Sequence, residues 1–443
     1  MGTVAEGEEA VGLSAHDLRV SVQRIRDYAQ PYQDLLVRRE QGNHLVRMIE
    51  GLTSGLERKS VEPIAVMHGI ERKLLQRFVG ENGWNHDPLR EHQRKEILEE
   101  IGTPNASLIL DGSATPKKGH ATVGVARQWC GRLGKVDSCV VGVYATYVGR
   151  DGLATIVDSQ LYLPEKGWID DPKRREEAYV PEEIEYRTQA ELALEMTQHL
   201  SKEMVFDWVL GDDEFGRSRA VRDGVFALGK NYAFDVPRDT RVRRLSGKKS
   251  WRADELAKTR RAGDWSWLHV RDGEKGPCEV VAFALPVMTR RKKGVWVSET
   301  LLVMEHPSDG RTTYCLARSH ETKDLLELVR RAGQRHRIEE VFEEAKGEVG
   351  LDHFEVRSWH GWHHHMTLCQ IAHWFLVREK RRLGKKSSWH HRQHDPERNR
   401  ASAIPGHRGG DGRAAQLSAR PERGGATSAL EGTRVTSTAP YFI

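Results

Sequence analysis

The chain lacks the marks of secreted and membrane-spanning proteins. It has only five cysteines, an odd number, at positions 130, 139, 278, 315 and 369. No two of them are separated by two residues, so a disulfide framework and a zinc knuckle are both disfavoured. No apolar run approaches the ~18 residues that a membrane span needs. Residues 1–9 are acidic and have neither the basic nor the apolar region of a signal peptide. We therefore expect a cytoplasmic protein with no membrane partner.

The chain also lacks a strong net charge, which is +5 over 443 residues. Overall charge therefore says little about nucleic acid. Basic residues are instead concentrated locally, in residues 241–252, in residues 290–293 and after residue 377. Such local patches are the electrostatic footprint of phosphate binding. Solvated surface loops are the alternative interpretation.

What the chain does have is one segment, residues 335–346, that reads as a helix with a functional face. At ~100° per residue, Arg335, Glu339 and Lys346 share one stripe. Gly350 is well placed as a C-terminal cap. A carboxylate flanked by cations fits a site for metal and phosphate, and an amphipathic helix with solvated charges is the alternative. The apolar residues expected to dock this helix on a core are Ile338, Phe342, Ala345 and Val349.

Two short apolar runs far upstream each end in an aspartate. They are Ser107-Leu-Ile-Leu-Asp111 and Asp207-Trp-Val-Leu-Gly-Asp212. Such runs are typical of buried strands in an α/β sheet, where functional groups gather at the carboxyl ends of the strands. Carboxylates brought together repel one another, and a divalent cation is the usual remedy. We therefore predict that both aspartates join Glu339 in one site.

Asp111, Asp212 and Glu339 resemble the Asp-Asp-Glu triad of insertion-sequence transposases with an RNase H-like, retroviral-integrase-like catalytic core. The residues around the aspartates are similar as well. They are Leu110-Asp111-Gly-Ser-Ala-Thr-Pro-Lys-Lys-Gly119 and Gly211-Asp212-Asp-Glu-Phe-Gly216. The resemblance runs from about residue 45 to about residue 385. Among neighbouring acids, the alternatives for the triad are Asp137, Asp213 and Glu343.

One branch of these transposases carries a Tyr-x2-Arg-x3-Glu-x6-Lys signature around the last acid. This chain reads Ala332-x2-Arg335-x3-Glu339-x6-Lys346, which matches three of the four positions. Ala332 replaces the tyrosine, so the ring contact that the family makes there is in doubt. By resemblance, Arg335 and Lys346 bind phosphates near the scissile bond.

The resemblance implies cut-and-paste transposition of a mobile element by metal-dependent phosphoryl transfer. Asp111, Asp212 and Glu339 would hold two Mg²⁺ ions about 4 Å apart, with Mn²⁺ able to substitute. One ion would activate a water or a 3′-hydroxyl, and the other would stabilise the leaving oxygen. The implied partner is double-stranded DNA, as transposon end and as target, bound by a homodimer at the nucleoid of a prokaryotic cell. Lys117 and Lys118 are further expected phosphate contacts.

Two other classes of function remain. An inactive transposase descendant would bind DNA and would need no acid triad. A generic metal-dependent DNA nuclease would share the triad but would not need a long β-rich insertion or end-specific binding.

Composition and periodicity predict an α/β protein in which a helical region precedes a mixed sheet. The expected RNase H-like core is divided into two segments by a β-rich insertion. The predicted regions are a disordered arm (1–30), an all-helical DNA-binding domain (31–105), the N-terminal core segment (106–237), the insertion (238–320), the C-terminal core segment (321–386) and a basic disordered tail (387–443). In the family that the chain resembles, this region usually consists of ordered helices. The tail is therefore either a native feature of this chain or the product of a frame shift.

Residues 60–79 resemble a helix-turn-helix. Gly69 lies at the turn, and the second helix would present Arg72, Lys73 and Arg77 outward, as a recognition helix requires. An ordinary helical hairpin fits nearly as well.

Two further clusters have both a functional and a structural interpretation. Tryptophans 251, 265, 267 and 296 in the insertion could stack on unpaired bases or belong to the core. Residues 359–373 are rich in histidine, but no acid of the metalloprotease pattern lies between the histidines. We expect this helix to pack against the core rather than to bind zinc.

Overall fold

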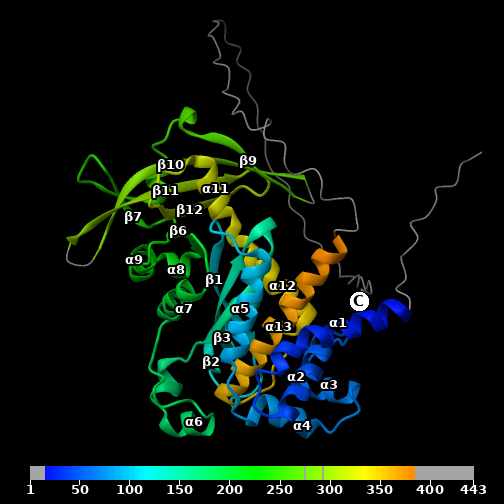
Figure 1. The fold of residues 1–443 in the computed structure, drawn as a ribbon. Coiled ribbons are helices and arrows are strands. Elements are labelled where there is room, and N and C mark those ends of the chain that lie inside the picture. The colour runs from blue at the N-terminus through cyan, green and yellow to red at the C-terminus, as the bar shows by residue number, and fades with distance from the viewer. Residues whose placement is uncertain (1–14, 274–275, 292–293, 385–443) are drawn as a thin grey trace, which may run out of the picture. The chain divides into compact units, whose positions relative to one another are not determined.

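The computed structural model describes residues 15–273, 276–291 and 294–384 (Figure 1). Within them, twelve strands form one mixed sheet, with the order β2-β3-β1-β5-β6-β12-β11-β10-β7-β8. Strand β4 pairs with β3, and β9 pairs with β10. The predicted α/β class is confirmed. The basic tail predicted for residues 387–443 lies outside the described residues.

The first half of the sheet belongs to the N-terminal core segment. β1 pairs antiparallel with β3 but parallel with β5, and β5 pairs parallel with β6. The six strands β1 to β6 are Ser107–Pro116, Ala126–Cys130, Lys135–Val148, Ala154–Leu161, Trp208–Gly211 and Asn231–Asp235. The helices α6 to α9 are Pro172–Glu177, Gln189–Glu203, Asp213–Gly216 and Arg219–Ala227.

Helices alone make up the N-terminal region. They are α1 to α5, with the bounds Ala15–Gln33, Arg39–Leu52, Val61–Met67, Arg72–Gln76 and Asp87–Ile101. A single π-helical turn, Arg77–Glu81, follows α4. Their apolar side chains share one continuous hydrophobic cluster with those of the sheet.

The disordered arm predicted for residues 1–30 is wrong for residues 15–30, which form most of α1. The helix is stable because its second half is anchored. Tyr28, Ala29 and Tyr32 are buried, and the Tyr28 hydroxyl donates to the carbonyl of Ile371, 2.9 Å away. Residues 1–14 lie outside the described residues. The sequence pattern missed α1 because the residue that anchors it, Ile371, lies far away in the chain.

Helices α3 and α4 are two short helices joined by a turn, which both the helix-turn-helix prediction and the ordinary hairpin require. The turn between them contains Gly69 at φ +62°, a left-handed conformation that favours glycine. Arg72, Lys73 and Arg77 are exposed, as expected. Their exposure is compatible with a recognition helix and with an ordinary hairpin, so DNA binding by this region stays a prediction.

The β-rich insertion extends the core sheet. Its strands β7 to β12 are Arg241–Arg244, Ser250–Arg252, Ser266–Gly273, Gly276–Arg290, Trp296–His306 and Arg311–Arg318, and its helix α10 is Ala253–Ala257. The predicted meander is present as β10, β11 and β12. β12 then pairs antiparallel with β6, which joins the insertion to the core. No sequence motif indicates this pairing, because strand neighbours far apart in the chain leave no local pattern.

The chain then returns to the core through α11 (Leu325–Gly333), α12 (Arg337–Val349) and α13 (Trp359–Gly384). The packing expected for the histidine-rich helix is confirmed, since His363, His364, His365 and His373 are all buried. The His364 ring stacks on Trp84 with centroids 3.8 Å apart. No helix among the described residues is both long and apolar enough to cross a bilayer.

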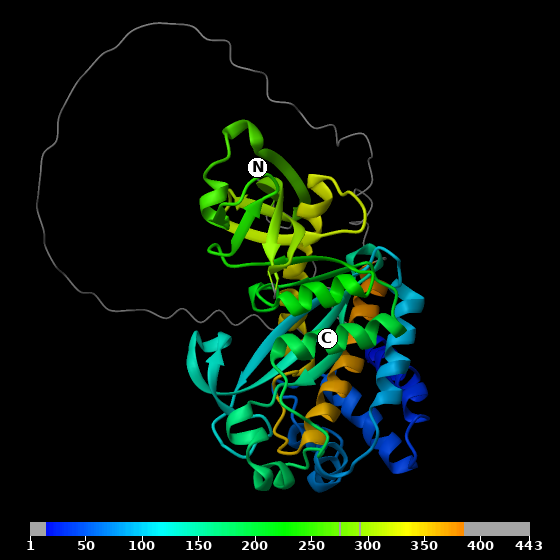
Figure 2. The same ribbon diagram turned by 90° about the vertical axis from the view of Figure 1, so that its left-hand side faces the viewer.

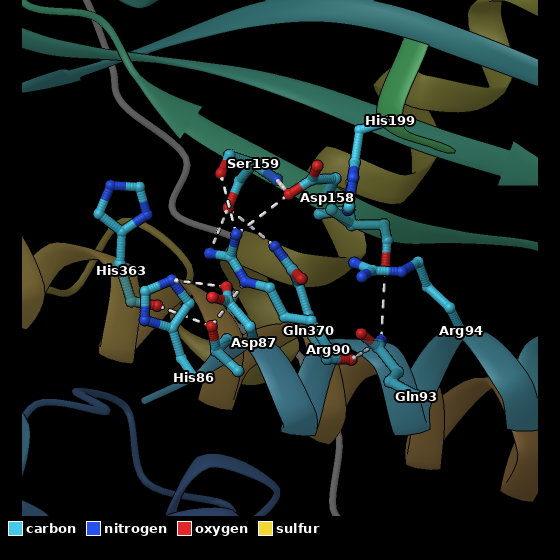
Figure 3. Close-up of polar contacts among 12 residues, drawn as sticks. His86, Asp87, Arg90, Gln93, Arg94, Asp158, Ser159, His199, His363 and Gln370 are labelled. Carbon is cyan, nitrogen blue, oxygen red and sulfur yellow. Dashed lines mark hydrogen bonds and ion pairs between the residues drawn. The ribbon is translucent and has the colours of Figure 1, made fainter. Parts of the chain in front are cut away.

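A buried polar network joins the N-terminal helices to the core (Figure 3). Arg90 on α5 is at its centre. Its guanidinium donates to Asp158 on β4 at 3.0 Å and to the hydroxyl of Thr367 on α13 at 2.9 Å. The neighbouring Gln93 amide donates to the carbonyl of Gln370, 3.0 Å away. Arg90 therefore links three elements that are distant in sequence. Its planar guanidinium fixes the directions of these hydrogen bonds.

Replacing Arg90 with Met should destabilise the fold strongly. The substitution leaves the Asp158 carboxylate buried without its partner, which typically costs about 3–5 kcal/mol. Urea unfolding followed by circular dichroism measures this loss. Arg26→Met is the matched control, because Arg26 is more than half exposed in its pair with Glu50 and should cost at most about 1 kcal/mol. Equal losses in the two variants would contradict a structural role for the network.

Candidate active site

The site is built where the parallel pairing of three neighbouring strands ends. Asp111, Asp212 and Asp235 each follow directly after the last in-register pair between β1, β5 and β6. In-register residues of neighbouring strands point to the same face of a sheet. The three carboxylates therefore form a row across the sheet, which we call the aspartate row.

The sequence pattern suggested that the first strand ends at Asp111, but β1 continues beyond this residue. β1 continues to Pro116 because β3 pairs with it along its whole length. β5, in contrast, stops at Gly211, since Asp212 is the N-cap of α8 and accepts a hydrogen bond from the amide of Glu214 at 3.0 Å. Beside Asp111, therefore, β1 loses its pairing with β5 but keeps its pairing with β3.

Arg335 and Glu339 lie together, as the predicted stripe required. Helix α12 begins at Arg337, so Arg335 belongs to the preceding 3₁₀ turn, Gln334–His336, rather than to the helix. The guanidinium of Arg335 nevertheless lies 3.0 Å from the Glu339 carboxylate and, through its Nε, 3.0 Å from Asp235. One cation thus connects the C-terminal core segment to the aspartate row.

Asp235 is the site residue that the sequence reasoning missed. It follows the run Asn231-Tyr-Ala-Phe, which has the same pattern of an apolar strand ending in an acid as the other two. The signal was therefore present. The Asp-Asp-Glu pattern has one acid after Asp212, and Glu339 already matches that position, so the pattern does not point to Asp235.

Burial and mutual repulsion raise the pKa values of the aspartate row. Burial, followed by the charge of Asp212, raises the pKa of Asp111 to about 7, although Arg335 opposes the shift. Burial and the adjacent Asp213 raise the pKa of Asp212. Burial raises the pKa of Asp235 to about 6, with Arg335 again opposing. The row is therefore short of positive charge.

The pKa of Arg335 is also raised, but by the charges of neighbouring carboxylates and not by burial. Burial lowers its pKa, but Asp235, Glu339, Asp111 and Asp212, in that order, outweigh burial and raise it. A single guanidinium balances four carboxylates. This excess of negative charge is what a divalent cation would relieve.

Lys346 lies on the same side of α12, two turns after Glu339. Burial lowers its pKa, while the charges of Asp352 and Asp111 raise it. Its ammonium lies 5.0 Å from the centre of the Phe342 ring. The predicted cap at Gly350 is confirmed, with φ +64°. The four apolar residues expected to dock α12 are all buried.

The remaining predicted phosphate contacts differ in their surroundings. Lys118 is exposed, but Lys117 points into the protein, where its ammonium donates to the carbonyl of Phe354 and lies over the ring of that residue. Burial lowers the Lys117 pKa to about 8. Lys117 therefore has an internal partner. Of the alternative acids, Asp213 pairs with Arg217 and Asp137 pairs with Lys135.

The aspartate row and Glu339 offer only carboxylate oxygens, the donors that Mg²⁺ and Mn²⁺ prefer. Among the described residues, no three histidine, cysteine or acidic side chains converge closely enough to hold a metal ion as they stand. Glu339 is turned toward Arg335 instead, with its side chain 60% exposed. The donor chemistry and the uncompensated charge fit a divalent cation, provided that Glu339 exchanges Arg335 for the metal.

Comparisons with known proteins agree with this chemistry. Residues 31–277 match the family model described as DDE superfamily endonuclease, and residues 180–375 match the one described as transposase DDE domain. A probable transposase for insertion sequence element IS701 from Microchaete diplosiphon is 28% identical over 202 residues. That alignment covers 45% of this chain and 49% of the relative, so the chain spans about half the length of the curated relative it matches.

Mg²⁺ should stabilise the protein against heat, because an ion that binds only the folded state at 100 times its Kd adds about 2.7 kcal/mol. Asp111→Asn and Asp212→Asn should lose this gain, whereas Asp213→Asn should keep it.

Without metal, Asp111→Asn should unfold at a higher temperature than wild type above pH 7. The raised pKa means that the ionised Asp111 carboxylate destabilises the fold there, while below pH 4 the difference vanishes.

Thermal unfolding with Mg²⁺ or with EDTA, at both pH values, measures these effects. A gain from Mg²⁺ that survives in the Asp111 and Asp212 variants would place the ion elsewhere.

Proposed function

The chain belongs to the DDE superfamily of endonucleases, and we propose that it is a DNA transposase that cleaves the ends of an insertion sequence and joins them to target DNA. The observation that carries this proposal is the aspartate row, with Asp111 beside Asp212 at one edge of the sheet. Arg335 and Glu339, from a helical segment more than a hundred residues later, face that edge. Acids and cation in this arrangement suit phosphoryl transfer.

Asp111, Asp212 and Glu339 are the residues proposed to hold the metal, with Mg²⁺ first and Mn²⁺ as a substitute. Two bound ions would favour ionisation of the attacking hydroxyl and stabilise the charge that develops on the leaving oxygen. Asp111 and Asp212 are preset for this by the strand register. Glu339 supplies its carboxylate from α12, at the end of a side chain that is free to reorient because it is largely exposed.

Arg335 has a second task once Glu339 turns away. Its guanidinium keeps the contact with Asp235 at 3.0 Å and has its remaining donors available for a phosphate oxygen. Asp235 is therefore proposed as a positioning residue for Arg335. Lys346, on the same side of α12, is proposed to hold a neighbouring phosphate.

The wider DNA surface is proposed from exposed cations. Lys118 lies beyond β1, and Arg72, Lys73 and Arg77 face outward from the helix-turn-helix segment. Double-stranded DNA, as transposon end and as target, is the proposed substrate, bound by a homodimer in the cytoplasm of a prokaryotic cell.

A catalytically inactive DNA-binding protein is less well supported. Three half-buried carboxylates with raised pKa values destabilise the folded state, and a protein that only binds DNA gains nothing from them. A generic nuclease shares the site, so the preference for particular DNA ends separates it from a transposase.

Single substitutions in the triad should abolish Mg²⁺-dependent cleavage and largely preserve DNA binding. Asp111→Asn, Asp212→Asn and Glu339→Gln keep side-chain size but remove the charge that holds the metal. Cleavage is assayed on DNA carrying the inverted repeats that flank the gene and on random duplex. Near-wild-type cleavage by any one variant would remove that residue from the triad. Equal cleavage of both DNAs by the wild type would favour the nuclease.

A double-mutant cycle tests the role of Asp235. Asp235→Asn should slow cleavage by about 10-fold to 100-fold, because Arg335 loses the contact that fixes its position. In an Arg335→Ala background, the same change should have no further effect, since Asp235 acts only through that guanidinium. Asp235→Glu should recover some of the rate. Additive losses in the double variant would show instead that Asp235 acts directly on the metal or the DNA.

A further inference from the structure

The hairpin formed by β2 and β3 carries an exposed apolar surface. Trp129, Leu133 and Val136 are 62%, 43% and 52% exposed. Trp129 and Val136 are opposite each other in the ladder, so their side chains share one face. A single exposed apolar residue is ordinary, but exposed apolar residues grouped on one hairpin make it a candidate binding surface. We call these three residues the hairpin patch.

The hairpin is a rigid support for this surface. Its opposite face is anchored by the buried side chains of Cys130, Cys139 and Val141, which pack together as a small cluster. The amide of Gln128 bridges the two strands by donating to the carbonyl of Cys139 at 3.0 Å. In Figure 2 the hairpin, drawn in cyan, projects from the body of the sheet. The patch is therefore held outward by packing beneath it.

Positive charge surrounds the hairpin patch. Arg127 is exposed and lies on the same face as Trp129, two residues along the strand. Lys135 and Arg132 are exposed as well, each in an ion pair with one carboxylate, Asp137 and Asp352 respectively. These three cations outnumber the two acids, so the surface around the patch carries a net positive charge. A positive surface attracts phosphate groups and repels other cations.

The turn of the hairpin is joined by an ion pair to the segment that follows α12. Arg132 pairs with Asp352, which follows α12 in the chain. Asp352, Arg132 and Asp111 all act on the pKa of Lys346, so the hairpin turn and the aspartate row both lie within electrostatic reach of this ammonium. A DNA strand bound by Lys346 would therefore pass near Arg132, which lies in the turn of the hairpin.

Trp129 differs from most tryptophans of the insertion. The Trp296 ring is covered by the guanidinium of Arg243 at 4.0 Å, and Trp251 by the ammonium of Lys249 at 3.6 Å. Trp265 packs on Phe283 with centroids 4.6 Å apart, and Trp267 is 60% exposed. Within the residues that the structure describes, the Trp129 ring contacts no other ring and no cation, so its face is open.

We propose that the hairpin patch binds unpaired nucleotides of the DNA strand next to the scissile bond, with Trp129 stacking on a base. An open indole face beside cations suits a base that has left the duplex, because the faces of paired bases are already stacked. The proposal rests on the proposed function, since it assigns a second contact to the same DNA. A second copy of this chain is the competing occupant.

The test compares two short duplexes of one sequence, fully paired or with a central unpaired stretch, bound in EDTA so that no cleavage occurs. The wild type should prefer the unpaired duplex. Trp129→Ala should lose about 5-fold to 150-fold of its affinity for that duplex alone, the range that one base stacked on an aromatic ring contributes. Trp129→Phe should keep most of it. Tyr179→Ala is the matched control, because Tyr179 is an exposed aromatic residue outside the hairpin (69%) and should change nothing.

Other outcomes overturn the inference in distinct ways. If the wild type shows no preference for the unpaired duplex, or if Trp129→Ala retains it, the hairpin assignment fails and the proposed function stands. If sedimentation shows that Trp129→Ala converts a dimer to a monomer with the DNA preference intact, the patch is a self-association surface. If the wild type binds neither duplex, the proposed function fails as well.

Discussion

One guanidinium shared among four carboxylates is the interaction on which the site depends. The parallel register of β1, β5 and β6 brings three aspartates to one edge of the sheet, where burial and repulsion favour protonation. Arg335 opposes this shift most strongly at all three aspartates, and Glu339 completes its ion pairs. The balance is incomplete, so the site is ready for more positive charge. This imbalance supports the proposal that the site binds a divalent cation.

The rest of the fold holds the two sides of that balance in place. β1, β5 and β6 carry the aspartates, while Arg335 and Glu339 arrive after the long insertion. The insertion is fixed to the core by Glu299, a fully buried carboxylate that accepts from Arg222 on α9 at 2.8 Å and lies 3.3 Å from Arg291. Helix α9 lies a few residues after Asp212. The ion pair between Arg222 and Glu299 therefore connects the insertion to the part of the core that carries the second aspartate.

Much of this arrangement could be predicted from local patterns. The apolar runs before Asp111 and Asp212, the stripe of Arg335 and Glu339, and the cap at Gly350 all depend on neighbours within a few residues. What could not be predicted depends on distant pairing, such as the joining of β12 to β6. Asp235 falls between these cases. The apolar run before it is a local pattern, but its ion pair with Arg335 joins residues that are far apart in the chain. The early start of α1 was hidden because its anchor, Ile371, lies more than three hundred residues away.

The central claim is that Asp111, Asp212 and Glu339 converge on a divalent cation and that Asp235 stays with Arg335. Anomalous diffraction from crystals soaked in Mn²⁺ tests it directly. The account predicts anomalous density beside the carboxylates of Asp111 and Asp212, with Glu339 turned away from Arg335 to reach it. Density ligated by Asp235 in place of Glu339, or absent from the aspartate row, would contradict it.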